Sequence, residues 1–258
     1  MSKNNEYILE KIDKQTSHSV HLSRTMMYKE IDLLISYMND SEFDPPKIKK
    51  AIIEENCLSK KTLNNRKISF ERLRSLYILD KESYIFQSFL YYWNCDTDGR
   101  RLLAFLLAYF RDFYVRISIP FILDIPYGEI LSVEYLIEKL RYKTYENITE
   151  KTLQSLVRNL RSTFSQSGHL TGKVKKTRIN PSLSSGAISF ALLLGYLEGM
   201  RGELLFQSEY MKSIECSPER GYNFAYDASS RGWLDFKKAG NIVEVSFSNF
   251  TKQKRNKS

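Results

Sequence analysis

The stretch Thr149–Arg178, TEKTLQSLVRNLRSTFSQSGHLTGKVKKTR, decides the expected fold of this chain of 258 residues. Thr149 is a favourable N-cap, and the segment Glu150–Phe164 then places apolar residues at intervals of three and four. This spacing predicts an amphipathic helix, which Gly168 ends. The apolar face consists of Leu153, Leu156, Val157, Leu160 and Phe164.

The residues on either side of this helix complete a known order of elements. The segment His169–Arg178 alternates around Val174, which predicts a β-ribbon or an extended wing. Before the amphipathic helix, Ser132 is able to cap a helix that runs to about Tyr142. Helix, turn, amphipathic helix and basic ribbon is the order of a winged helix-turn-helix.

The positive charge of the chain is concentrated in the same region. Lys and Arg number 39 against 30 Asp and Glu, which gives a formal net charge of +9 and a pI near 9.3. The segment Arg141–Arg178 holds nine Lys and Arg against two Glu, and so contributes +7 of that total. Such a concentration favours a polyanionic partner. We expect double-stranded DNA, and RNA stays open because neither a stacking platform nor a groove reader stands out.

The expected contacts lie on the outer face of the amphipathic helix and along the ribbon. The helix offers N-terminal N–H groups to a phosphate, its outer face reaches base edges, and the ribbon follows the backbone. The predicted DNA-binding residues of this region are Thr149, Lys151, Gln154, Ser155, Arg158, Arg161, Lys173, Lys175, Lys176 and Arg178. The alternative is a solvated basic surface whose helix only packs.

A second, irregular helix-turn-helix outline appears over Lys60–Leu79. Four apolar residues there share a face, but Asn64 and Asn65 are expected to break the helix, with Ser69 capping a second piece. The basic residues Lys60, Lys61, Arg66 and Lys67 are further predicted DNA contacts. Two ordinary core helices with solvated lysines explain the same pattern equally well.

The whole chain is predicted to be mostly α, a multi-helix protein with helix-turn-helix and winged-helix-like elements and a small C-terminal β-hairpin. Residues 1–18 are expected to form a flexible arm, 19–128 an N-terminal helical domain, 129–250 a winged-helix-like domain and 251–258 a basic tail. A central core helix is predicted over Arg100–Ile117, ended by Pro120. The hairpin joins Trp233–Phe236 to Ile242–Phe247 through Gly240 and Asn241.

Few residues point to chemistry. Three scattered cysteines, Cys57, Cys95 and Cys216, indicate free thiols in a reducing compartment, and the first and second are expected to be buried. No metal-ligand spacing or phosphate-binding loop occurs, so we predict no catalytic centre, no metal and no cofactor. The longest apolar run has nine residues, about half a bilayer span, which indicates a cytoplasmic protein with no membrane partner. A metal-dependent nuclease that uses Asp235 and Lys237 is the least favoured alternative.

Several stretches resemble the BrxA family of the bacteriophage-exclusion (BREX) defence systems. They are Ile52–Thr62 followed by Arg72 and Leu73, then Leu103–Val115, and Ile148–Thr152 with the apolar helix that follows it. The resemblance covers roughly Ser19–Phe247. It implies a small, nearly all-helical DNA-binding protein without enzymatic activity that serves antiviral defence beside other BREX proteins. The runner-up function is an assembly subunit whose basic face docks an acidic protein.

Overall fold

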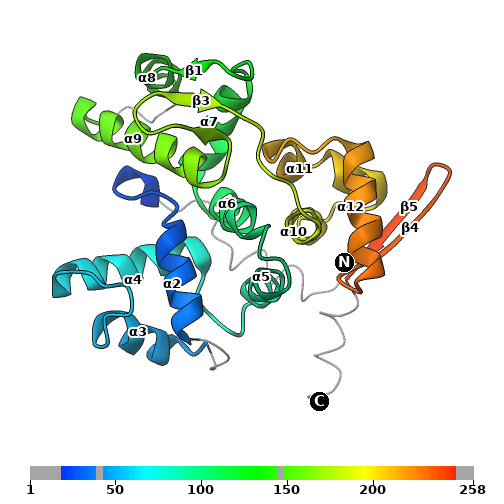
Figure 1. Cartoon of the computed structure of the whole chain (residues 1–258), viewed down its shortest axis with the longest axis horizontal. Coiled ribbons are helices and arrows are strands. Elements are labelled where there is room, and N and C mark those ends of the chain that lie inside the picture. The colour runs from blue at the N-terminus through cyan, green and yellow to red at the C-terminus, as the bar shows by residue number, and fades with distance from the viewer. Residues whose placement is uncertain (1–18, 39–42, 144–147, 248–258) are drawn as a thin grey trace. The chain divides into compact units, whose positions relative to one another are not determined.

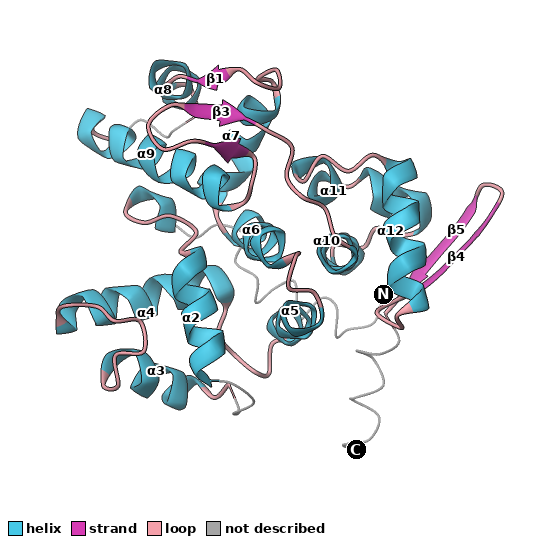
Figure 2. Ribbon diagram, viewed as in Figure 1, coloured by secondary structure: helices cyan, strands magenta, loops and turns pink. Residues whose placement is uncertain are grey.

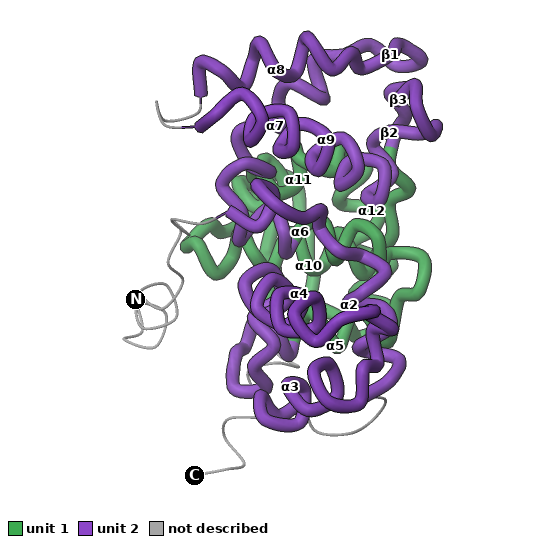
Figure 3. The backbone as a smooth tube through the Cα atoms, turned by 90° about the vertical axis from the view of Figure 1, so that its left-hand side faces the viewer, with its two compact units in different colours: residues 1–14, 88–106, 181–258 green, residues 15–87, 107–180 purple. Residues whose placement is uncertain are grey.

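The computed structural model describes residues 19–38, 43–143 and 148–247, and within them helices predominate (Figure 1). The predicted arm (1–18) and basic tail (251–258) lie outside the described residues. The chain divides into two compact units (Figure 3). Unit 1 comprises 1–14, 88–106 and 181–258, and unit 2 comprises 15–87 and 107–180. Each predicted domain therefore contributes to both units, and the predicted boundary at residue 129 coincides with no division.

Unit 2 combines several helices with a small sheet. Its elements are η1 (Val20–Leu22), α2 (Tyr28–Met38), α3 (Pro45–Ile53), α4 (Leu63–Tyr77), α7 (Phe113–Leu123), β1 (Ile130–Leu131), α8 (Val133–Arg141), α9 (Glu150–Gln166), β2 (Leu170–Thr171) and β3 (Lys176–Arg178). The sheet is antiparallel in the order β1-β3-β2, with Ile130 opposite Thr177 and Leu170 opposite Arg178 (Figure 2). The strand β1 was not anticipated from the sequence.

Two helix predictions in unit 2 are corrected. The expected break at Asn64 and Asn65 does not occur, because Thr62 caps one continuous α4: its side chain accepts a hydrogen bond from the N–H of Asn65. The predicted helix over Arg100–Ile117 is two helices, α6 (Arg100–Arg111) and α7, because Asp112 caps α7. Pro120 does not end a helix but lies inside α7.

Unit 1 is organised around α10 (Ser185–Leu197), of which almost every residue is buried. Around it lie η2 (Gly202–Gln207), α11 (Glu209–Ser213) and α12 (Pro218–Ser230), and residues 88–106, from α5 (Tyr84–Cys95) and α6, belong to the same unit. The hairpin of β4 (Asp235–Ala239) and β5 (Ile242–Ser246) contacts η2 and α12. The predicted hairpin is confirmed, with Ala239 opposite Ile242 and Gly240 at φ +56° in the first turn position, as a type II′ turn requires. The helix α12 was missed, although Ser217 and Pro218 form a favourable start.

One carboxylate joins two helix starts in unit 1. Asp96 accepts hydrogen bonds from the N–H of Gly99, just before α6, at 3.1 Å and from the N–H of Gly186, in the first turn of α10, at 2.8 Å. A Cβ at Gly186 would lie 2.4 Å from Oδ2 and 2.6 Å from Cβ of Asp96. The close approach of the two segments therefore requires glycine at this position.

Candidate nucleic-acid interface

The helix α9 divides into a buried and an exposed face, as its periodicity predicts. All five apolar residues named for its inner face are buried. Lys151, Gln154 and Arg158 are exposed on the opposite side, and Ser155 is half-buried beside them. The Nη2 atom of Arg158 donates to Oγ of Ser155 at 2.8 Å, so these two predicted contacts are joined. Ser162, one turn after Arg158 and partly exposed, extends this face and was not singled out from the sequence.

The start of α9 is already occupied by its own cap. Oγ1 of Thr149 accepts a hydrogen bond from the N–H of Thr152 at 3.2 Å, so Thr149 acts as the N-cap. Glu150 forms an exposed ion pair with Arg141 of α8 at 2.9 Å. The negative charge of Glu150 at the start of α9 is thereby balanced by Arg141. Thr149 is exposed and acts as the structural cap of α9, and its predicted phosphate contact stays a prediction.

The loop between β2 and β3 projects three exposed side chains. Lys173, Val174 and Lys175 are all exposed, and 85% of the surface of Val174 is accessible. Gly172 begins the loop at φ +93°, a conformation that favours glycine. The Nζ atom of Lys176 donates to the carbonyl of Gly172 at 2.7 Å and so closes the loop. Partial burial, and then repulsion from Arg161, lowers the pKa of Lys176.

Arg161 links this loop to α9. Its Nη2 atom donates to the carbonyls of Leu131 in β1 and Val174 in the loop, each at 3.3 Å. The side chain is half-buried, and burial lowers its pKa. Arg161 therefore fixes the position of the loop relative to the helix, whereas Arg158 remains on the open face.

Arg178, in contrast, is part of the core of unit 2. Only 1% of its surface is accessible, and its guanidinium donates to the carbonyl of Ile122 at 3.1 Å and to that of His169 at 3.3 Å, as well as to that of Ile179. The ring of Tyr127 lies 5.0 Å from its Cζ atom. The DNA contact predicted for Arg178 is not available in this fold, because the charge is enclosed by backbone carbonyls. His169 is likewise buried, with Nδ1 2.8 Å from Oγ of Ser167.

Of the four basic residues predicted near α4, two are engaged by other parts of the fold and two are exposed. Nζ of Lys60 forms a partly buried ion pair with Glu30 at 2.7 Å. Nη1 of Arg66 donates to the carbonyl of Ile53 at 2.8 Å and thereby covers the end of α3. Lys61 and Lys67 are exposed. Only these two stand open to a polyanion.

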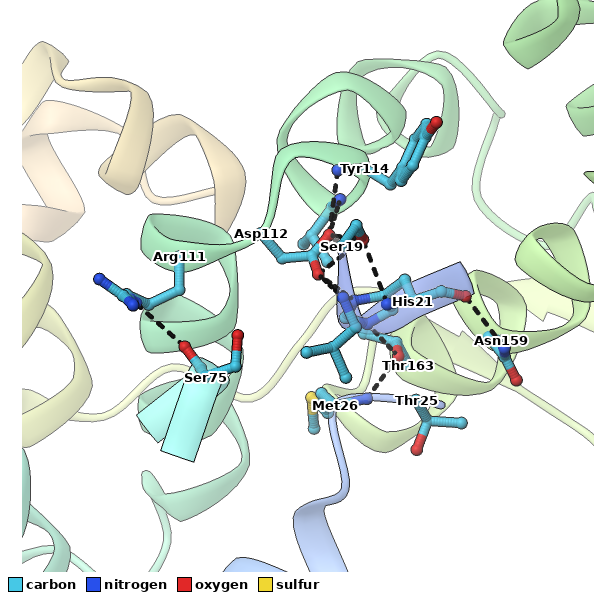
Figure 4. Close-up of polar contacts among 12 residues, drawn as sticks. Ser19, His21, Thr25, Met26, Ser75, Arg111, Asp112, Tyr114, Asn159 and Thr163 are labelled. Atoms are coloured by element: carbon cyan, nitrogen blue, oxygen red, sulfur yellow. Dashed lines mark hydrogen bonds and ion pairs between the residues drawn. The ribbon is translucent and has the colours of Figure 1, made fainter. Parts of the chain in front are cut away.

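A buried polar cluster fixes α9 to the segment that precedes α2 (Figure 4). Nδ1 of His21 lies 3.0 Å from Oδ2 of Asp112, and Nε2 of His21 lies 2.9 Å from Oγ1 of Thr163. Ser19 Oγ donates to Asp112 at 2.7 Å, and Asn159 Nδ2 donates to the carbonyl of His21 at 2.9 Å. Hydroxyl, imidazole and carboxylate stand in the order of a catalytic triad, but His21 and Thr163 are fully buried, so no substrate reaches them.

The carboxylate of Asp112 is ionised within this cluster. Burial by itself opposes ionisation, but the attraction of His21 and the hydrogen bonds from His21, Ser19 and the N–H of Val115 outweigh it and lower the pKa of Asp112 to about 2. The signal in the sequence was an isolated acid in the apolar run from Leu102 onward. The partner of that acid lies more than ninety positions earlier in the chain, which periodicity does not reveal.

The remaining groups considered for chemistry are the Asp235 and Lys237 pair, possible metal ligands and the cysteines. Asp235 accepts a hydrogen bond from Ser246 at 3.1 Å across the β4–β5 ladder, beside the exposed Lys237. Within the described ranges, no three His, Cys, Asp or Glu side chains gather as a metal site. All three cysteines are free. Cys95, at the last position of α5, is exposed, and Cys57 is only half-buried, so the expectation that both are buried is not met. Burial raises the pKa of all three thiols, to about 11 for Cys57 and Cys216.

Among the residues that the structure describes, no helix is both long enough and apolar enough to cross a membrane. The sequence matches no protein-family model, and no curated protein is significantly similar to it. The chain is therefore assigned to no family, and the interface rests on the geometry of its own residues.

Proposed function

We propose that the protein binds double-stranded DNA through the exposed face of α9 and the β2–β3 loop. The observation that carries this proposal is the convergence of exposed basic side chains from two elements. Lys151 and Arg158 project from α9, Lys173 and Lys175 project from the loop, and Arg161 ties the loop to the helix. Electrostatic attraction to phosphates supplies most of the affinity of such a surface.

The order of elements supports a winged helix-turn-helix mode of binding. The pair α8 and α9 is followed by two strands that flank the exposed loop, and β1, before the pair, joins the same sheet. In this mode α9 enters the major groove, where Gln154 and Arg158 face base edges. Lys151, Lys173 and Lys175 then contact phosphates and set the position of the helix.

The cellular role that we propose is DNA binding without catalysis in the bacterial cytoplasm, as part of an anti-phage assembly. It rests on the sequence resemblance to the BrxA family, carried by Ile52–Thr62, Leu103–Val115 and Ile148–Thr152. An assembly subunit that docks an acidic protein is the second candidate. The exposed Val174 between two lysines favours it, because an apolar tip gains more from a protein surface than from a phosphate.

Fluorescence anisotropy across a salt series tests the proposal with duplex DNA, single-stranded DNA and duplex RNA as probes. Loss of two phosphate contacts in the variant Lys173→Ala, Lys175→Ala makes the negative slope of log affinity against log salt shallower by about 1.8 for duplex DNA. The control Lys237→Ala, Lys238→Ala removes the same charge from the β4–β5 hairpin and leaves the slope unchanged. Equal slopes for all three proteins, or no duplex binding at about 100 mM salt, would exclude this interface.

A further inference from the structure

The helix α4 repeats the arrangement of α9 in the other half of unit 2. Each follows a shorter helix, and each begins at a threonine whose hydroxyl caps the third helical residue, Thr62 in α4 and Thr149 in α9. The exposed Lys61, Asn64 and Lys67 lie at the N-terminal end of α4. Farther along this face, Glu71 and Arg74 neutralise one another at 3.0 Å. Fully exposed and unpaired positive charge on α4 is thus found at its start, and farther along only the partly exposed Arg72 adds to it.

The segment between Ser19 and Tyr28 joins α4 and α9 through buried hydrogen bonds. The hydroxyl of Tyr77 in α4 donates to the carbonyl of Met26, and the N–H of Met26 donates to Oγ1 of Thr163 in α9 at 2.9 Å. These contacts are buried and connect residues far apart in the chain. The C-terminal parts of the two helices are therefore held at a fixed separation, with η1 in contact with both helices.

The basic ends of the two helices lie on the same side of unit 2. In Figure 1 the N-terminal ends of α4 and α9 are both at the left, and η1 lies between them. Figure 3 faces this side and displays α9 above α4. Where η1 lies between α4 and α9, the axes of these two helices are about 20 Å apart, since a helix with its side chains is about 10–12 Å wide. That distance corresponds to about six base pairs at about 3.4 Å each.

We propose that α4 is a second contact element for the same duplex, with Lys61 and Lys67 binding phosphates about half a helical turn away from those bound at α9. The inference rests on the proposed function. Double-stranded DNA suits a site of fixed span, because it is straight over this length, its persistence length being about 150 base pairs. A flexible single strand gains no such benefit from the rigid spacing. The footprint on DNA is accordingly longer than one winged helix-turn-helix alone would cover.

Duplex length separates the two contact elements in an anisotropy experiment with the full chain. A DNA hairpin with a stem of about 5 base pairs, about 17 Å long, is too short to reach from one helix to the other, whereas a duplex of about 24 base pairs occupies both. The variant Lys61→Ala, Lys67→Ala makes the negative salt slope shallower by about 1.8 on the long duplex and leaves it unchanged on the short one. The variant Lys173→Ala, Lys175→Ala makes the slope shallower on both duplexes, and Lys237→Ala, Lys238→Ala changes it on neither.

The outcomes distinguish this inference from the proposed function. If the Lys61, Lys67 variant matches the wild type on the long duplex while the Lys173, Lys175 variant does not, α9 and the loop bind DNA and α4 plays no part. If no variant differs from the wild type on either duplex, or the wild type binds neither, both proposals are wrong. Circular dichroism of each variant confirms that the exposed substitutions leave the fold intact.

Discussion

Replacing Asp112 by Asn tests the role of the buried cluster most directly. The substitution keeps the size of the side chain but removes its charge. The carboxylate accepts hydrogen bonds from Ser19 Oγ at 2.7 Å, from the N–H of Val20 at 2.9 Å and from the N–H of Tyr114 at 3.0 Å, besides its ion pair with His21. An amide has only one oxygen, so at least one of these donors is left facing an NH₂ group.

The magnitude follows from the pKa and the lost acceptor. Because the pKa of Asp112 falls from 3.8 to about 2 on folding, its ionised form contributes about 2.5 kcal/mol to the free energy of unfolding at neutral pH. An unsatisfied buried donor adds about 1–3 kcal/mol. We expect Asp112→Asn to destabilise the protein by about 4 kcal/mol at pH 7.

The charge-dependent part has a defined pH window. A folded pKa below the unfolded value gives a stabilisation that is complete above the unfolded pKa and is lost as pH falls through the folded one. About half of the 2.5 kcal/mol is therefore gone at pH 3, where the wild type and Asp112→Asn approach each other in stability.

Urea denaturation followed by circular dichroism at pH 7 and pH 3 measures both quantities. The control Asp124→Asn removes an exposed charge at the other end of α7 and changes stability by less than about 0.5 kcal/mol. The tryptophans, Trp93 and Trp233, both belong to unit 1, so their fluorescence reports separately on that unit. Equal midpoints for Asp112→Asn and the wild type at pH 7, or a difference that does not shrink at pH 3, would refute the reasoning.

Three further substitutions or measurements address the remaining structure. Replacing Arg178 by Ala leaves backbone carbonyls without donors and lowers the free energy of unfolding by about 3 kcal/mol. Thermal denaturation measures this loss, and an unchanged melting temperature would contradict the buried role of Arg178. Gly186→Ala drives a Cβ into Asp96 and costs about 1–3 kcal/mol by the same measurement, whereas a neutral result would mean that the helices separate freely. Iodoacetamide at about pH 8 alkylates the exposed Cys95 before Cys216, whose pKa is raised to about 11 by burial. Mass spectrometry of peptides gives the order of alkylation, and alkylation of Cys216 before Cys95 would contradict the burial of Cys216.

Local sequence determined the helical character of the chain and the faces of its regular elements. The cap at Thr149 and the spacing of Leu153, Leu156 and Leu160 placed α9 correctly, and Gly240 and Asn241 placed the C-terminal turn. These features depend on residues within one or two turns of each other, so periodicity and capping are sufficient to predict them. The boundary at Asp112 was missed because an apolar run on both sides continues the helical pattern through it.

Tertiary structure decided which basic residues face the solvent. Lys175 and Arg178 belong to the same predicted ribbon and carry the same charge, yet one is exposed and the other is enclosed by carbonyls from α7 and the β-ribbon. Near α4, Lys60 and Arg66 are likewise engaged by Glu30 and by the end of α3, whereas Lys61 and Lys67 stand free on the surface. The partners come from segments distant in the chain, so local pattern cannot assign them. Burial of a cation depends on the carbonyls or carboxylates that the fold brings to it, and only the folded chain supplies these.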